Sequence, residues 1–324
     1  MIEYQYSPED CDVRASQREK LERFRERREV WHEWLVSDEA SIWNQIHIML
    51  WNDVVFWSIN EMRRIAHEEA DDGFGFNPEL ASMIDQGYAT TQLLAIRKLT
   101  DPSGDALSLP RLLSDMKRNS ELFTRELYVC NDGLSFEGEN SELSGIVLGG
   151  SENPADPVFS RMRVGGPTDA FTSQRTHKSF DMIPHLPGAS RRDELVNPNV
   201  FDALKSKLGV CANVSKVASK FVAHAADAQS RKKLSERDRR VTFEKIRVCQ
   251  RAIVRVASAI RGPLLDFSST DLYPTPQYDH LEKIEVPMVR TENVELISDF
   301  WDEHQRKNEN WLEGGWDALV TYMS

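Results

Sequence analysis

Apolar residues at helical spacing constrain this chain more than any other feature of its sequence. Between residues 39 and 70, Trp43, Ile46, Leu50, Val54 and Trp57 recur at intervals of three or four positions, which places them on one face of an α-helix. The same period runs through residues 14–36, 78–101, 110–127, 198–208, 210–234, 235–262 and from 294 onward. We therefore predict an all-α protein built as an antiparallel helical bundle.

Local helix signals agree with these boundaries. Pro78 follows a loop rich in Gly and Asn and is predicted to open the third helix, because proline is favoured in the first helical turn. The run Asp101-Pro102-Ser103-Gly104 is predicted to end it. Ser108 with Pro110 is predicted to start a fourth helix that extends to about residue 127.

The stretch from Tyr128 to Asn197 differs in composition from its neighbours. It is rich in Gly, Ser, Asn and Pro and has no helical period, so we predict an irregular insertion with short β-like pieces at 144–148 and 161–164. The expected organisation is N-terminal bundle helices at 1–127, the insertion at 128–197, basic C-terminal bundle helices at 198–262 and an acidic helical tail at 263–324.

Several classes of protein do not fit the sequence. The first residues, MIEYQYSPEDCDVR, lack the apolar core of a signal peptide, and the most apolar run, 46–59, is too short to span a bilayer. The four cysteines are far apart and match no metal or redox spacing. We therefore expect a reduced cytoplasmic protein without a membrane segment. There is no phosphate-binding glycine loop or nucleophile elbow, and we expect no cofactor.

Charge is distributed unevenly along the chain. The net charge is −12, yet residues 201–262 hold 15 Lys/Arg against 5 Asp/Glu, whereas residues 263–324 hold 4 against 13. One interpretation is that the acidic tail and the basic helices simply pack together. The other is that the basic block binds a polyanion such as RNA. Both hold if the tail covers the basic face.

The predicted helix at 210–234 carries the residues of greatest chemical interest. Its expected apolar face consists of Val210, Val214, Val217, Phe221, Ala225 and Ala228, and the adjoining face of Asn213, Lys216, Lys220, Asp227 and Arg231. His224 lies on the border between the two faces. It suits a general acid–base or a phosphate contact, and the alternative is a border histidine bonded to a neighbouring helix.

Two short strings resemble a known family. Lys220-Phe221-Val222-Ala223-His224-Ala225, and the helix end 94–101 followed by 108–113, resemble the HEPN superfamily and within it the AbiU-type abortive-infection branch. The match covers residues about 40–128 and 198–262. The resemblance implies a helical bundle of HEPN type, a homodimer, a role in phage defence or a toxin–antitoxin system with a protein partner, and metal-independent endoribonuclease activity in many members.

The sequence departs from that family at one position. Catalytic members carry an Arg with four to six residues between it and the His, but Val217, Ala218 and Ser219 occupy those places here. No neutral side chain replaces a guanidinium at a phosphate. We predict that Arg97 completes a composite site with His224 and Lys220; alternatively, Asp101 caps a turn and Arg97 pairs locally.

Two further groups of residues could in principle carry chemistry. Arg25 or Arg27 precedes His32 at the family spacing, and His177, Asp181, His185 and Asp193 fit no metal signature, so no metal is expected. The predicted nucleic-acid-binding residues are Lys216, Lys220, Arg231, Lys232, Lys233, Arg239 and Arg240. Two hypotheses follow: a HEPN-like defence protein that binds or cleaves RNA, or a non-catalytic helical scaffold or immunity protein that retained the bundle.

Overall fold

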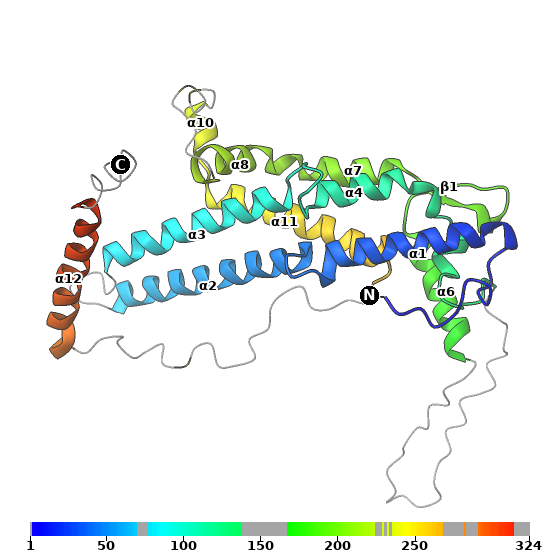
Figure 1. Cartoon of the computed structure of the whole chain (residues 1–324), viewed down its shortest axis with the longest axis horizontal. Helices are drawn as coiled ribbons and strands as arrows, with labels where there is room; N and C mark the ends of the chain where they lie inside the picture. The colour runs from blue at the N-terminus through cyan, green and yellow to red at the C-terminus, as the bar shows by residue number, and fades with distance from the viewer. Residues whose placement is uncertain are drawn as a thin grey trace, which may run out of the picture. The chain divides into compact units, whose positions relative to one another are not determined.

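The computed structural model describes residues 2–69, 77–137, 167–223, 229, 232, 235–267, 282 and 291–313. The chain divides into two compact units, Met1–Pro274 and Thr275–Ser324. Helices make up most of the described residues, and the long helices of the first unit lie side by side (Figure 1). The predicted all-α helical bundle is confirmed.

The elements of the first unit follow in chain order. Its α-helices are α1 (Arg18–His32), α2 (Ile42–Glu69), α3 (Pro78–Leu99), α4 (Leu109–Arg118), α5 (Arg125–Val129), α6 (Pro167–Asp181), α7 (Asn199–Lys207), α8 (Ala212–Val217), α10 (Glu236–Arg239) and α11 (Phe243–Ala259). Shorter turns include the π-helical η2 (Glu33–Ser37), η6 (Ala218–Ala223) and η7 (Ile260–Leu264) and the 3-10 turns η3 (Ser120–Leu122), η4 (Arg191–Asp193) and η5 (Leu208–Cys211). Strands β1 (His185–Leu186) and β2 (Leu195–Val196) pair antiparallel, with His185 opposite Val196.

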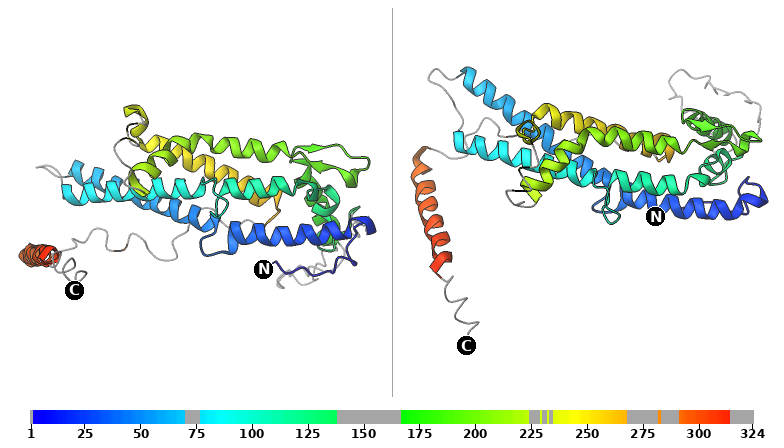
Figure 2. Two further views of the ribbon diagram at one scale, coloured as in Figure 1. Left: turned by 45° about the horizontal axis from the view of Figure 1, so that its top comes forward. Right: turned by 90° about the horizontal axis from the view of Figure 1, so that it is seen from above.

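Helices α2 and α3 form a pair, and α11 packs against both of them (Figure 2). The rings of Phe56 and Tyr88 stack with their centroids 3.7 Å apart, and Phe243 of α11 lies 5.6 Å from Phe56. The Tyr88 hydroxyl donates a 2.5 Å hydrogen bond to Asp53, and the Gln250 amide donates to the same carboxylate at 3.0 Å. Asp53 of α2 therefore accepts hydrogen bonds from both α3 and α11 inside this mainly apolar contact.

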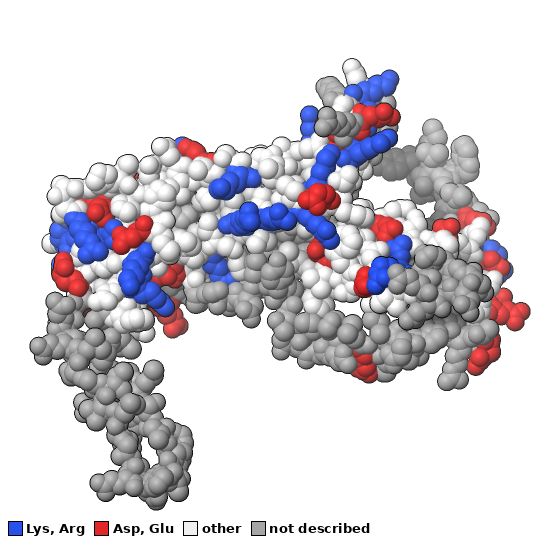
Figure 3. Space-filling model, turned by 180° about the vertical axis from the view of Figure 1, so that it is seen from behind, with Lys and Arg blue, Asp and Glu red and all other residues white. Residues whose placement is uncertain are grey.

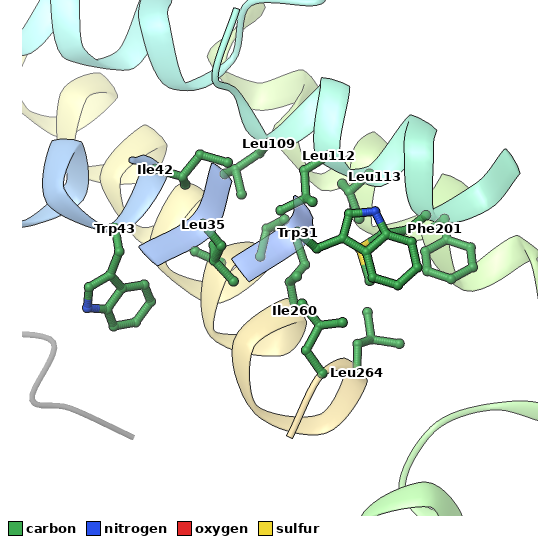
Figure 4. Close-up of a cluster of buried hydrophobic side chains, with 14 of the residues drawn as sticks. Trp31, Leu35, Ile42, Trp43, Leu109, Leu112, Leu113, Phe201, Ile260 and Leu264 are labelled. Atoms are coloured by element: carbon green, nitrogen blue, oxygen red, sulfur yellow. The ribbon is translucent and has the colours of Figure 1, made fainter. Parts of the chain in front are cut away.

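A second part of the core surrounds Trp31. Trp31 is fully buried, stacks on Phe123 at 5.1 Å and donates from Nε1 to Asp115 at 2.9 Å. Phe201 of α7 lies 5.5 Å from Phe123. Figure 4 shows the cluster, which includes Trp31, Leu35, Ile42, Trp43, Leu109, Leu112, Leu113, Phe201, Ile260 and Leu264. The core thus brings together residues from the beginning and the end of the first unit's sequence.

Helix ends follow the local signals in the sequence. The Asn77 side chain accepts hydrogen bonds from the backbone of Glu79 and Leu80, and α3 begins at Pro78 as predicted. After α3, Asp101 Oδ1 accepts from the Ser103 backbone at 2.9 Å and forms the predicted turn. These caps satisfy backbone groups that a helix leaves without partners at its ends.

The fourth helix is shorter than the sequence predicts. It ends at Arg118, and a separate helix α5 starts at Arg125 instead of one helix continuing to residue 127. Thr124 caps α5, while the Phe123 carbonyl accepts from Val196 N at 3.0 Å. The backbone here is bonded to β2 and its neighbours, which are about 70 residues away in the sequence, so local periodicity misplaced the helix end.

Part of the predicted insertion at 128–197 is a helix that the sequence pattern did not predict. Residues 167–197 form α6, β1, η4 and β2, which pack on the bundle, while the predicted β-like pieces at 144–148 and 161–164 lie outside the described residues. Phe180 of α6 is fully buried and lies 5.4 Å from Tyr128. Burial against α5, rather than a strong apolar stripe, holds this helix in place.

The predicted helix pair at 198–208 and 210–234 is one helical run from Asn199 to Ala223 whose winding changes at η5 and η6. Its buried face consists of Cys211, Val214, Val217 and Ala218, whereas Val210 and Phe221 are 52% and 40% exposed. Those two residues were wrongly assigned to the apolar face, because 3-10 and π turns shift the helical phase. Ala225 and Ala228 lie outside the described residues.

The second unit contains the 3-10 turn η8 (Thr291–Asn293) and α12 (Val294–Glu313), the acidic helix predicted for the tail. Within the described residues we find no helix with the length and apolar content needed to cross a membrane.

Candidate functional site

The predicted site residues fall on two adjoining parts of the first unit. Lys216 lies exposed on α8, Lys220 lies half-buried on η6, and Lys232 is exposed. Arg239 and Arg240 are exposed at the end of α10, which contacts α8. The predictions for His224, Arg231 and Lys233 concern residues outside the described part of the chain.

The C-terminal end of α3 is bonded to this helical run. Arg97 Nε donates a 2.8 Å hydrogen bond to Ser219 Oγ, and Ser219 Oγ in turn donates to the Ser215 carbonyl at 3.0 Å. One turn further on, the hydroxyls of Thr100 and Ser215 are 2.8 Å apart. The structure thus brings Arg97 to the turn that contains Lys216 and Lys220, although α3 is more than a hundred positions away.

This contact places an arginine near the position where the HEPN-like pattern expects one and this sequence has none. Ser219 is one of the three positions where the HEPN-like pattern expects an arginine, and the Arg97 guanidinium lies against it from the neighbouring helix. Nε is occupied by Ser219, while the described residues form no ion pair with the Nη groups. A guanidinium carries five N–H donors, so the Nη face retains donors for a phosphate.

The predicted turn at Asp101 is present as well. Asp101 Oδ1 accepts from the backbone and hydroxyl of Ser103, and these bonds hold the pKa of the Asp101 carboxyl below its usual range, with Arg97 contributing less. The alternative reading is therefore correct for Asp101, which caps a turn. Arg97 pairs with a residue of a different helix instead of locally.

A row of arginines on α11 was not among the predicted site residues. Arg247, Arg251 and Arg255 are all exposed and follow one another at four-residue intervals, which places them on one helix face about 6 Å apart along the axis. No Asp or Glu occurs between residues 245 and 265. In the described part of the chain none of these three arginines forms an ion pair, and the Arg247 guanidinium lies 4.2 Å from the Trp57 ring centroid.

The helix that carries this row begins next to Arg239 and Arg240 in the chain and is bonded to Arg240. The Lys245 ammonium donates to the Arg240 carbonyl at 2.8 Å, and Asn213 of α8 donates to the Asp238 carbonyl at 3.2 Å. Figure 3 views the molecule from behind and shows Lys and Arg side chains along this side of the body, surrounded mainly by uncharged atoms. We call Arg97, Lys216, Lys220, Arg239, Arg240, Arg247, Arg251 and Arg255 the basic surface.

A period in the sequence would have found the missed row. The arginines recur every four residues opposite the buried Ile246, Ile253 and Val256, which is the pattern of a helix with one apolar and one cationic face. The dense string of charges at 231–240 drew attention because its residues are neighbours in sequence. The α11 arginines are separated in the sequence by apolar residues, so they are recognised as a group only from their four-residue spacing.

The polar residues of 177–193 have a structural role. Arg125, which is almost fully buried, bonds Asp181 at 2.5 Å and Glu194 at 2.6 Å, and His177 Nε2 lies 2.7 Å from the Phe136 carbonyl. Burial lowers the pKa of His177, and nearby arginines add to the effect. In the described ranges, no three His, Cys, Asp or Glu side chains converge as metal ligands would.

The arginine–histidine spacing on α1 does not form a catalytic pair. Arg25 is buried and donates to the carbonyls of Asn131 and Tyr6, at 2.8 and 2.9 Å. Arg27 pairs with Asp115 at 3.4 Å. Both guanidiniums hold the bundle together and point to different partners, so the spacing before His32 has a structural explanation.

No family model, curated protein or solved structure matches this chain.

Proposed function

We propose that this chain binds single-stranded RNA through the basic surface. The observation that carries the proposal is the row of Arg247, Arg251 and Arg255, which is exposed and forms no ion pair within the described residues. The acidic residue of α11, Glu244, lies one turn before Arg247, and no carboxylate follows on this helix. Arginines without anionic partners raise the local potential and bind successive phosphates of a strand. A row used only for stability would be expected to pair with nearby carboxylates, as Arg23 and Arg27 of α1 and Arg125 of α5 do.

Exposed aromatic rings support a single strand over a duplex. Phe243 and Phe221 are 42% and 40% exposed and belong to α11 and η6, the elements that carry the basic surface. Aromatic rings beside a cationic track stack on unpaired bases, which are not accessible in a duplex. The resemblance to the HEPN superfamily supports RNA among the polyanions and suggests a role in phage defence by abortive infection, as a homodimer or with a partner protein.

Salt dependence of binding tests this proposal. Each phosphate contact on a single strand contributes about −0.7 to the slope of log K against log salt. Replacing Arg247, Arg251 and Arg255 by Gln in the full chain should therefore make the slope shallower by roughly 2. The matched control replaces Arg18, Lys20 and Arg23 of α1, which removes the same charge from another helix. An equal change in both variants, or a flat salt response of the unmodified chain, refutes binding by this surface.

Cleavage is a second candidate, favoured by the contact between Arg97 and Ser219. In this reading Arg97 supplies the guanidinium that stabilises charge on the phosphate, while His224 and Lys220 complete the site. The test is incubation of total RNA with the full chain and chelator, comparing the unmodified protein with Arg97→Ala and His224→Ala. Loss of cleavage in both variants supports a metal-independent endoribonuclease. If all three leave RNA intact, the chain is a non-catalytic binding or scaffold protein.

A further inference from the structure

A pocket of about 400 Å³ lies beside α1 and α6, and no residue of the basic surface lines it. Its walls come from the N-terminal segment, α1, the residues after α5, α6 and the residues after η7. This volume lies within the range of small-molecule sites in proteins. Neither RNA binding by the basic surface nor the proposed chemistry at Arg97 uses this pocket.

The polar part of the wall is held in place before any ligand arrives. Arg28 is 8% exposed and donates to Asn131 Oδ1 at 2.6 Å and to the Leu265 carbonyl at 2.8 Å. Asn131 Nδ2 donates to the Tyr128 carbonyl at 2.7 Å. Side chains fixed by several hydrogen bonds keep a pocket open and oriented, which lowers the entropic cost of binding.

Two side chains of the pocket retain unused hydrogen-bonding groups. The Tyr4 hydroxyl is buried close to the Arg28 guanidinium, and no group in the described part of the chain accepts a hydrogen bond from it. The His32 ring packs edge-on against Phe267 at 4.9 Å, and burial beside Arg28 and Arg261 lowers its pKa. His32 is therefore neutral at pH 7 and offers one donor and one acceptor. A buried hydroxyl without a partner is costly unless a ligand or water satisfies it.

The charges around the pocket select against an ionic ligand. Arg28 lies on one wall, while the carboxylates of Asp132 and Asp266 lie on others. An anion would meet the two aspartates, and a cation would meet Arg28. An uncharged planar ring with both donors and acceptors avoids both repulsions, and Phe267 and Tyr4 offer aromatic surfaces for it.

The acceptors further define the ring. Asp132 Oδ1 accepts from the backbone of Gln5 and Tyr6, at 2.8 and 3.2 Å, and the described residues donate no hydrogen bond to its second oxygen. Asp266 adopts a positive φ of 50° at the pocket edge, and no described residue bonds to its carboxylate. Carboxylates accept hydrogen bonds from exocyclic amino groups of bases.

We propose that this pocket binds an uncharged nucleobase that carries an exocyclic amino group, supplied either by a free nucleoside or by an unstacked residue of an RNA strand. The ring lies against Phe267, its amino group faces Asp132 or Asp266, and the Tyr4 hydroxyl and His32 bond its ring atoms. The pocket shares no lining residue with the basic surface, so nucleobase binding there and RNA binding by the basic surface are independent.

Isothermal titration calorimetry of the full chain tests this proposal. The ligands titrated are adenosine, guanosine, cytidine, uridine and ribose 5-phosphate. Saturable binding of at least one of the three amino-bearing nucleosides is expected, with uridine weaker and ribose 5-phosphate not bound. Tyr4→Phe should weaken binding about fivefold, the value of one neutral hydrogen bond. Tyr6→Phe is the matched control, because Tyr6 is 47% exposed and does not line the pocket. Phe267→Ala should weaken binding about tenfold through lost stacking.

Four results would contradict nucleobase binding in this pocket. Equal binding of uridine, binding of ribose 5-phosphate, no saturable binding at millimolar nucleoside, or equal effects of Tyr4→Phe and Tyr6→Phe overturn the inference. If Phe267→Ala fails to fold, the two tyrosine variants decide. A single adenosine in an otherwise abasic oligonucleotide that competes better than free adenosine identifies RNA as the source, and equal potency identifies the nucleoside. The α11 triple variant should keep nucleoside binding, which separates this proposal from RNA binding.

Discussion

The carboxylate of Glu126 offers the most direct test of how α5 is joined to the N-terminal segment. It is completely buried. Arg14 donates to it from the backbone at 2.9 Å and from Nε at 2.9 Å, and Arg192 donates from Nη1 at 3.1 Å. The change we consider is Glu126→Gln, which preserves size but replaces one charged acceptor oxygen with a donor.

The expected loss follows from the partners that remain. Removing one member of a buried ion pair costs about 3–5 kcal/mol, because the other charge stays behind without compensation. Arg14 and Arg192 have 39% and 22% exposed side chains and keep Asp193 and Asp12 as partners. Water and these aspartates reduce the penalty, so we expect a loss of about 3 kcal/mol in the free energy of unfolding.

Urea denaturation followed by tryptophan fluorescence and circular dichroism measures this loss. The control is Asp202→Asn, which breaks the 2.6 Å pair with Lys117 whose side chains are 46% and 54% exposed. An exposed pair contributes about 0–1 kcal/mol. A loss below about 1 kcal/mol for Glu126→Gln would refute the argument, because a buried pair would then be worth no more than an exposed one. A loss as large for Asp202→Asn would show that burial is not the cause.

Two further predictions concern the histidines and the core. Burial lowers the pKa of His32 and His177 in the folded chain. Below about pH 6.5 the unfolded chain therefore binds more protons than the folded chain. The free energy of unfolding should accordingly decrease as the pH is lowered from about 7 to about 5. Replacing His177 by Gln should flatten this slope in urea titrations at each pH, and an unchanged slope would contradict the assignment. Trp31→Ala should cost about 4 kcal/mol, because it removes a fully buried ring and its bond to Asp115. A cost below about 1 kcal/mol in the same assay would mean that the core collapses around the missing ring.

Local physics accounts for much of the fold. The period of Trp43, Ile46 and Leu50 on α2 predicts a helix because 3.6 residues per turn bring these side chains to one face, and all three are buried in the structure. Caps at Pro78 and Ser108 predict two helix starts to within one residue. Such signals depend on neighbours in sequence, so they can be read without the tertiary structure.

The same signals fail where distant contacts decide the outcome. Helix α6 has a weak apolar stripe, and contacts with residues distant in sequence hold it in place, among them Phe180 on Tyr128 and Asp181 with Arg125. The run from Asn199 to Ala223 changes winding at η5 and η6, which exposes Val210 and Phe221. The 3-10 and π turns rotate the side chains that follow them around the helix axis. A sequence pattern read with a constant 3.6 residues per turn does not predict this rotation.

Some features of the candidate site are set by the sequence alone, and others depend on the tertiary structure. The excess of Lys and Arg in 201–262 and the four-residue spacing of Arg247, Arg251 and Arg255 are properties of the sequence, and helical geometry alone places these arginines on one face. The contact of Arg97 with Ser219 belongs to the tertiary structure, since the two residues are 122 positions apart. The structure also decides which arginines find carboxylates and which do not. Ion pairing depends on distances across the packed bundle, which no local spacing determines.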